Sequence, residues 1–181
     1  MRLLAISGSV RQGSYNTALL RAAAGCTANS QFVVWPGLAE IPAYDQDLDG
    51  LPAPLPVAAL RHEIDKADAV LIATPEYNGS IPGALKNALD WLSRPFATNV
   101  LRNKRVAVVG ASTGLFGAAG AQAELRKVLA VIGADVLDTP LLVPTAHKAF
   151  APDGRLEDRT VEGALCAIVQ ELARDPAARA A

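Results

Sequence analysis

The sequence predicts an α/β fold in which helices cover both faces of a parallel sheet, and three observations support this. Short runs rich in Val, Ile and Leu show little alternation, as strands buried on both faces should. Longer stretches suited to helices separate these runs. The two kinds of segment alternate along the chain, which favours right-handed βαβ crossovers. The expected strands are residues 3–6, 32–34, 69–73, 106–109 and 141–143, and the expected helices are 17–24, 57–66, 83–93, 119–132 and 159–174.

The helix over residues 83–93 has the clearest pattern. Its apolar positions form one stripe, and Pro82 is expected just inside its start, where a missing N–H costs nothing. Five strands fit a flavodoxin-like three-layer sandwich with a five-stranded parallel sheet of order 2-1-3-4-5 better than the six-stranded dinucleotide fold. Ligands of such sheets bind outside the carboxyl ends of the strands, so function should lie in the loops after the first, third and fourth strands.

Length and composition limit the classes of protein. The 181 residues predict a single domain over 1–181 with a frayed end at 175–181, and 17 basic against 18 acidic residues give no reason to expect nucleic acid or an acidic membrane. Apolar runs are too short for a membrane span or a signal peptide. Cys26 and Cys166 lie far apart without a C-x-x-C motif, so we expect two buried thiols in a reduced, cytoplasmic protein, and we expect no metal site.

The first loop reads GSVRQGSYN over residues 8–16 and opens a helix. Small residues, a helix N-terminus and the charge of Arg11 suit a phosphate monoester, although an ordinary turn capped by Ser14 or Asn16 would look similar. The P-loop spacing is half met by Gly8 and Gly13, but the required Lys and hydroxyl are missing. The dinucleotide fingerprint G-x-G-x-x-G is also absent.

The other two loops suit a flat, partly apolar ligand. The second reads TPEYNGSIPGALKNALDW over residues 74–91, where Tyr77 offers an aromatic face with a polar tip. The third reads GASTGLFGAAG over residues 110–120, and its glycines allow close backbone approach. Alternatively, the second loop has only a structural role, as a rigid turn that packs on its own helix.

At these motifs the chain resembles the NADPH-dependent FMN reductases, a flavodoxin-like family that includes quinone, chromate and azo-dye reductases. The string PEYN…PGxLKNAxDW is the most specific part, and IPAYDQDL over residues 41–48 also fits the family pattern. The resemblance covers roughly residues 3–133. It implies FMN as cofactor, NADPH or NADH as reductant, and small-molecule electron acceptors.

The resemblance also implies roles for particular residues, with no catalytic side chain because the flavin carries the chemistry. The FMN phosphate would be held by Ser9, Arg11, Ser14 and Asn16, and Tyr15 would also contact the cofactor. The isoalloxazine would be bordered by Pro75, Glu76, Tyr77 and Asn78 on one side and by Ser112, Thr113 and Gly114 on the other.

The family usually forms dimers with the flavin near the subunit boundary, and some members are tetramers. We therefore expect a homodimer or homotetramer, in which Trp91 or Phe116 would contribute to an interface unless it belongs to the core. Gly120 stands where family members often carry an Arg, and Ala123 stands where some tetrameric quinone reductases have a Tyr, which leaves the choice between dimer and tetramer open.

Two other functions stay under consideration. A flavodoxin-like electron carrier would bind flavin without NAD(P)H turnover. A serine hydrolase would use Ser112 within G-x-S-x-G, with Asp138 and His147 downstream. The stretch LFGAAG, however, delays by several residues the helix that should follow a nucleophile elbow directly.

Overall fold

The predicted sheet order is confirmed by the computed structural model, which describes residues 1–27, 30–50 and 52–174. The expectation of a frayed end at 175–181 lies outside the described residues. All strand pairs are parallel, in the order β2-β1-β3-β4-β5, and β6 also pairs with β4. The strands are β1 (Arg2–Ser7), β2 (Gln31–Trp35), β3 (Ala69–Ala73), β4 (Arg105–Ala111), β5 (Asp135–Val136) and β6 (Leu141–Val143).

The fifth position of the sheet is divided between two short strands, which the sequence did not predict. β5 pairs with the beginning of β4, and β6 pairs with its end, where Val109 lies opposite Leu141. Pro140 precedes β6 and has no N–H to donate, so an uninterrupted ladder cannot form at this point.

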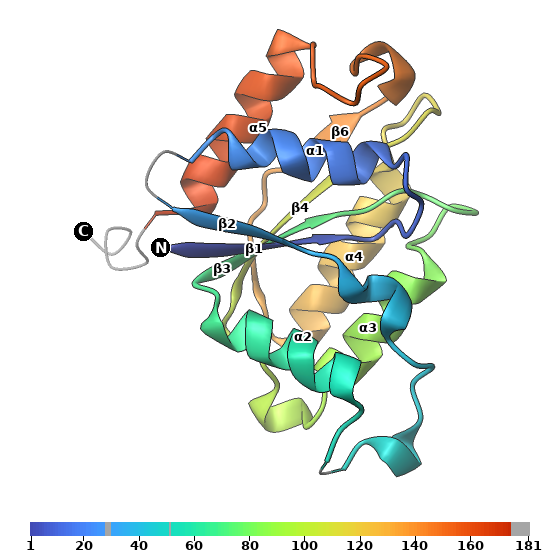
Figure 1. Cartoon of the computed structure of the whole chain (residues 1–181), viewed down its shortest axis with the longest axis vertical. Coiled ribbons are helices and arrows are strands. Elements are labelled where there is room, and N and C mark those ends of the chain that lie inside the picture. Colours follow the sequence, from blue (N-terminus) through green and yellow to red (C-terminus); the bar gives the residue numbers. More distant parts are fainter. Residues whose placement is uncertain (28–29, 51, 175–181) are drawn as a thin grey trace.

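Helices cover both faces of the sheet (Figure 1). Helices α1 and α5 lie on one face, and α2, α3 and α4 lie on the other. The ranges are α1 (Tyr15–Ala24), α2 (Leu55–Lys66), α3 (Gly83–Leu92), α4 (Ala119–Ile132) and α5 (Arg159–Leu172).

Each face of the sheet has its own apolar core. Every residue of β3 and β4 is buried, and alternate residues of these strands point into the two cores, which explains the absence of apolar–polar alternation in their sequences. Trp91 of α3 is fully buried and donates its Nε1–H to the carbonyl of Pro42 at 2.8 Å. It is therefore a core residue.

The expectation of two free thiols is wrong, because Cys26 and Cys166 form a disulfide. Cys26 follows the end of α1 and Cys166 lies within α5, and the fold places these helices on the same face of the sheet. Their Cα atoms are 4.9 Å apart despite a separation of 140 residues. The bond joins the segment after α1 to helix α5, which lie far apart in the sequence.

The loops after β1, β3 and β4 lie at one edge of the sheet, at the right of Figure 1. Within the ranges described above, no helix is both long enough and apolar enough to cross a membrane.

Candidate functional site

A cavity of about 280 Å³ forms where the three loops meet at the carboxyl ends of β1, β3 and β4. All of the predicted site residues except Asn78 and Gly114 line it, together with Ala111, which the sequence did not single out. The lining residues are Ser9, Arg11, Ser14, Tyr15, Asn16, Pro75, Glu76, Tyr77, Ala111, Ser112 and Thr113.

The first loop combines a capped helix start with unused backbone donors. Ser14 is the N-cap of α1, and its Oγ accepts hydrogen bonds from the backbone N–H groups of Asn16 and Thr17 at 3.2 and 3.4 Å. The backbone N–H groups of Gln12 and Gly13 have no acceptor in the described part of the chain. A helix N-terminus with free donors favours an anion.

Arg11 adds a positive charge at this helix start. Its Nη2 donates to the carbonyl oxygen of Gly13 at 2.6 Å, and its guanidinium carbon lies 6.0 Å from the centre of the Tyr15 ring. These contacts hold the guanidinium against the loop while leaving other N–H groups available to a ligand.

The side chain of Asn16 is occupied by the protein itself. Its Nδ2 donates to the carbonyl of Ala111 and its Oδ1 accepts from the N–H of the same residue, both at 2.9 Å. Asn16 is buried, and its backbone N–H already donates a hydrogen bond to Ser14 Oγ. The Asn16 side chain therefore joins the first loop to the end of β4. The resemblance had instead implied that Asn16 would contact the phosphate directly.

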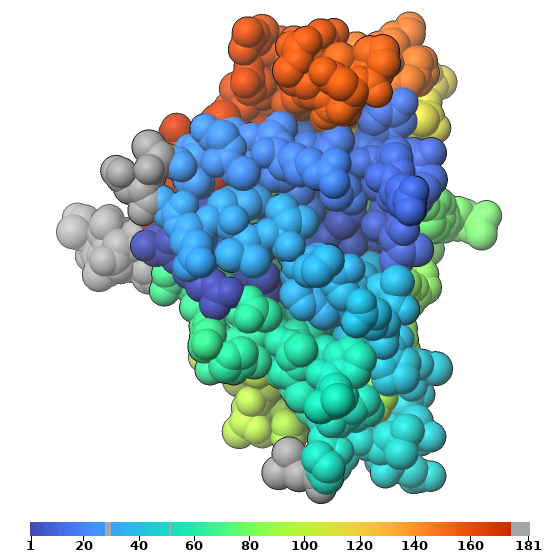
Figure 2. Space-filling view, viewed as in Figure 1, coloured from blue at the N-terminus to red at the C-terminus, as the bar shows by residue number. Residues whose placement is uncertain are grey.

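The second loop contains a tight two-residue turn at Asn78 and Gly79, directly after Tyr77. The backbones of Tyr77 and Ser80 exchange hydrogen bonds of 3.0 and 3.1 Å, and Asn78 and Gly79 between them have φ angles of +55° and +75°. Asn-Gly is the sequence that favours such a turn. Tyr77 is 52% exposed, and the segment over residues 76–80 projects from the molecule at the right of Figure 2.

Glu76 connects the second loop to helix α4. Its Oε2 accepts a hydrogen bond from the backbone N–H of Ala121 at 3.0 Å, in the first turn of α4. A Cβ on Gly120 would come within 3.1 Å of the same carboxylate oxygen. The glycine at 120 thus leaves room for the carboxylate at the helix N-terminus, where a negative charge is favourable.

The third loop is held close to its neighbours by backbone contacts. Ser112 donates its backbone N–H to the carbonyl of Val143 at 3.0 Å, and Gly117, with φ +57°, lies where a Cβ would be 2.8 Å from the Val143 nitrogen. Two large apolar side chains of this loop, Leu115 and Phe116, are each 77% exposed. Phe116 is thus a surface residue, unlike Trp91.

The serine-hydrolase arrangement is not formed around Ser112. Its Oγ accepts a hydrogen bond from the N–H of Gly114 at 3.1 Å, and no bond joins it to His147 in the described residues. β4 ends at Ala111 and α4 begins at Ala119, so the turn is not a strand-to-helix elbow.

Comparisons with known proteins agree with the resemblance noted in the sequence. The family model for NADPH-dependent FMN reductases matches residues 1–148. An NAD(P)H-dependent FMN reductase of Pseudomonas aeruginosa is 42% identical over 159 residues, which cover 87% of this chain and 85% of the relative. A quinone reductase of Escherichia coli K12 is 40% identical over 144 residues, covering 77% of this chain and 75% of that protein.

Solved structures give the same result. A flavoenzyme NAD(P)H:(acceptor) oxidoreductase from Paracoccus denitrificans superposes with a TM-score of 0.84 at 34% identity, and the match covers 94% of each chain. The matched family region contains all three loops of the cavity, including the turn that carries Tyr77 and the Arg11 loop. This chain belongs to the NADPH-dependent FMN reductase family.

Proposed function

We propose that this chain catalyses the oxidation of NAD(P)H by small electron acceptors of the quinone, chromate or azo type, with FMN as its bound cofactor. When bound, FMN would supply the redox chemistry, which is hydride transfer from the nicotinamide followed by transfer of two electrons to the acceptor. The observation that carries the proposal is the meeting of an anion-binding loop, an aromatic turn and a glycine-rich loop in one cavity.

The first loop fits the phosphate end of FMN. Free backbone N–H groups of Gln12 and Gly13, the α1 N-terminus and the Arg11 guanidinium all favour a phosphate at this place. The Ser9 and Ser14 hydroxyls line the same cavity and can donate to phosphate oxygens. The Asn16 side chain would act indirectly, by fixing this loop against β4.

The second and third loops fit the ring end. The backbone N–H groups of Glu76 and Thr113 have no acceptor in the described residues and can donate to the polar edge of a flavin. Tyr77 offers a flat surface beside the ring, and the buried Pro75 limits the entry of water on the sheet side. No general acid, base or nucleophile is required of these residues.

The rim of the site is exposed at Tyr77 and Thr113, which would allow a permissive acceptor range. An acceptor would therefore approach the cavity along a surface that faces solvent. We expect relaxed selectivity among planar or oxyanion acceptors, since few side chains are placed to exclude one of them.

Steady-state NADPH oxidation with benzoquinone tests this function. The proposal predicts turnover that depends on added FMN and shows ping-pong kinetics. Flavin binding without NADPH oxidation would instead support an electron carrier. Labelling of Ser112 by a fluorophosphonate, with no flavin bound, would support the hydrolase.

We also propose that the chain is a single domain over 1–181 that acts as a homodimer. Two cores share one sheet, and the exposed Leu115 and Phe116 next to the cavity suit burial against a second copy. Light scattering of the FMN-loaded protein should give the mass of two chains, and Phe116→Ser should reduce it to one. A mass of four chains in the unmodified protein would favour the homotetramer.

For location we propose the cytoplasm, because the reaction consumes NAD(P)H. The Cys26–Cys166 bond is unusual for a reducing compartment, where thiols are mostly kept reduced. Cell fractionation followed by thiol labelling would test the location and the state of this pair together.

A further inference from the structure

A second cavity, of about 510 Å³, lies between the start of α1 with its preceding loop and the segment over residues 147–154, which follows β6. This volume falls within the roughly 300–1,000 Å³ of most ligand pockets. The second cavity shares Arg11, Ser14 and Tyr15 with the candidate flavin cavity. The two cavities therefore meet at the loop proposed above for the FMN phosphate, and a ligand that continues beyond this phosphate would enter the second cavity.

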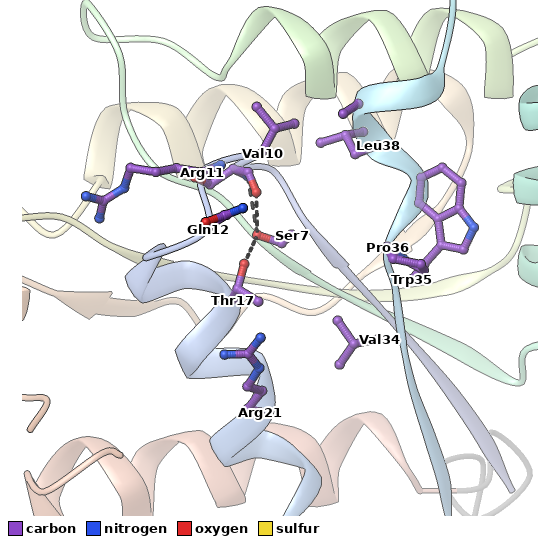
Figure 3. Close-up of a pocket in the computed structure, with 12 residues that line it drawn as sticks. Ser7, Val10, Arg11, Gln12, Thr17, Arg21, Val34, Trp35, Pro36 and Leu38 are labelled. Atoms are coloured by element: carbon purple, nitrogen blue, oxygen red, sulfur yellow. Dashed lines mark hydrogen bonds between the residues drawn. The ribbon is translucent and has the colours of Figure 1, made fainter. Parts of the chain in front are cut away.

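Contacts between neighbouring side chains show that one wall of the second cavity is continuous. The guanidinium carbon of Arg11 lies 6.0 Å from the centre of the Tyr15 ring, and this ring centre lies 5.5 Å from that of Phe150. Both rings pack with the apolar core on the face of the sheet that α1 and α5 cover. Figure 3 shows that the Arg11 side chain extends away from Trp35 and Leu38. Arg11, Tyr15 and Phe150 therefore line one space.

The lining of the second cavity carries more positive than negative charge. Arg11 and Arg21 contribute to it, and Asp153 is the one acidic side chain among the described residues that line it. The Asp153 carboxylate accepts a hydrogen bond from the backbone N–H of Arg155 at 3.0 Å. Arg21 is exposed and forms no hydrogen bond or ion pair within the described part of the chain. The cavity thus offers one guanidinium in addition to Arg11, which suits a second phosphate group.

The rest of the lining is largely aromatic and apolar. Tyr15, Ala18 and Phe150 form this part, and the exposed imidazole of His147 borders it without a hydrogen bond to any described residue. Aromatic rings beside an imidazole suit a flat heterocycle. The Asp153 carboxylate has lone pairs left over and can accept a hydrogen bond from the exocyclic amine of adenine. The second cavity therefore combines groups for a phosphate with groups for a purine base.

We propose that the second cavity binds the adenylate half of FAD, so that the chain accepts FAD as well as FMN. This inference rests on the proposed function, because it takes the first cavity to be the flavin site. Arg11 and Ser14 line both cavities and would let a pyrophosphate cross from one to the other, with Arg21 facing the second phosphate. A separate nucleotide would be repelled by the FMN phosphate, whereas in FAD a covalent bond holds the two phosphates together.

Calorimetric titration of the flavin-free chain with FMN and with FAD tests the second cavity without turnover. FAD should bind with an affinity within about tenfold of that of FMN. Arg21→Gln should weaken FAD binding about tenfold and leave FMN binding unchanged, because it removes one charge-assisted phosphate contact. Lys127→Gln on α4, an exposed cation outside both cavities, is the matched control and should change neither affinity. Weaker FAD binding than this, or an Arg21→Gln effect that is the same for both flavins, would overturn the proposal.

The two histidines of the chain provide a second readout, by NMR. His147 lines the second cavity, whereas His62 is exposed on α2, which covers the other face of the sheet. Exchange of bound FMN for FAD should shift the imidazole proton signals of His147 and leave those of His62 unchanged, and the spectrum of His147→Gln assigns the signals. Unchanged His147 signals would overturn the proposal.

The same titrations separate this inference from the proposed function. If FMN binds and is reduced by NADPH while FAD does not bind, the adenylate site is wrong and the proposed function stands. If neither flavin binds, both are wrong.

Discussion

The side chain of Asn16 makes two hydrogen bonds of 2.9 Å with the backbone of Ala111, which lies 95 residues away. An amide group matches one backbone donor and one backbone acceptor at once, so this pair joins the start of α1 to the end of β4. Two of the three loops around the cavity are therefore held together by a single buried side chain.

Asn16→Ala should lower the free energy of unfolding by about 2–4 kcal/mol, because the N–H and carbonyl of Ala111 lose their partner in a buried place. Urea unfolding of the FMN-free protein measures the change. Gln170→Ala, on the exposed side of α5, is the matched control and should change stability by less than about 0.5 kcal/mol. Equal effects of the two substitutions would show that the bridge is unimportant.

Arg11→Ala should weaken FMN binding by about 1.5–3 kcal/mol, which is roughly 10- to 150-fold, because it removes a charged phosphate partner. Fluorescence titration with FMN measures the affinity. Riboflavin, which has no phosphate, is the matched ligand control and should bind equally well to both proteins. A comparable loss for riboflavin would place Arg11 at the ring and not at the phosphate.

Glu76 should act through helix α4. Glu76→Ala removes the acceptor of the Ala121 N–H and should lower FMN affinity by about tenfold, whereas Glu76→Gln keeps an acceptor and should retain most of it. Flavin titration of both variants measures the difference. If Gln fails to rescue the Ala variant, the charge itself and not the hydrogen bond holds the loop.

Gly120→Ala tests the same contact from the other side. The new Cβ would crowd the Glu76 carboxylate, so FMN affinity should fall as in Glu76→Ala. Gly163→Ala in α5 has open space around it and should stabilise the protein slightly, since Ala favours a helix by about 0.5–1 kcal/mol over Gly. A stabilising effect at both positions would mean that the carboxylate moves away without cost.

Tyr77→Ala should change acceptor kinetics more than it changes FMN retention, because the ring is exposed on a projecting turn. We expect a lower kcat/KM for benzoquinone and an altered flavin spectrum. Tyr77→Phe should keep both, since the flat face remains. Loss of the folded state in Tyr77→Ala, seen by circular dichroism, would favour the alternative role of packing within its own loop.

Reduction of the Cys26–Cys166 bond should lower stability by about 2–4 kcal/mol, because the bond closes a long loop in the unfolded chain. For a chain of this size the midpoint of thermal unfolding should fall by roughly 5–15 °C. Dithiothreitol should shift the unmodified protein but not the Cys26→Ser/Cys166→Ser double variant. An equal midpoint with and without the reductant would contradict a stabilising role.

The sequence predicts elements and sheet order well here because buried parallel strands and amphipathic helices leave a direct pattern. The strand β3 was predicted at its observed bounds, Ala69–Ala73, and α4 at Ala119–Ile132. The interrupted fifth position was not predicted, because the Leu141–Val143 run gives no sign that Asp135–Val136 also pairs with β4.

The site was predictable in its location but less so in its internal contacts. Polar residues of ligand-binding loops look alike in sequence, and only burial distinguishes Asn16, which binds Ala111, from Arg11, which remains exposed. The Cys26–Cys166 bond was missed for a related reason. Local patterns describe which face a helix buries, but a contact across 140 residues depends on the topology that places α1 beside α5.

The visible spectrum of the FMN-loaded protein under anaerobic conditions tests the central claim most directly. We predict a bound-flavin band near 450 nm, a property of the cofactor, that bleaches on addition of NADPH and returns on addition of benzoquinone. Failure to retain FMN would contradict the proposal that the three loops form a flavin-binding site. A bound flavin that NADPH does not bleach would contradict the reductase activity.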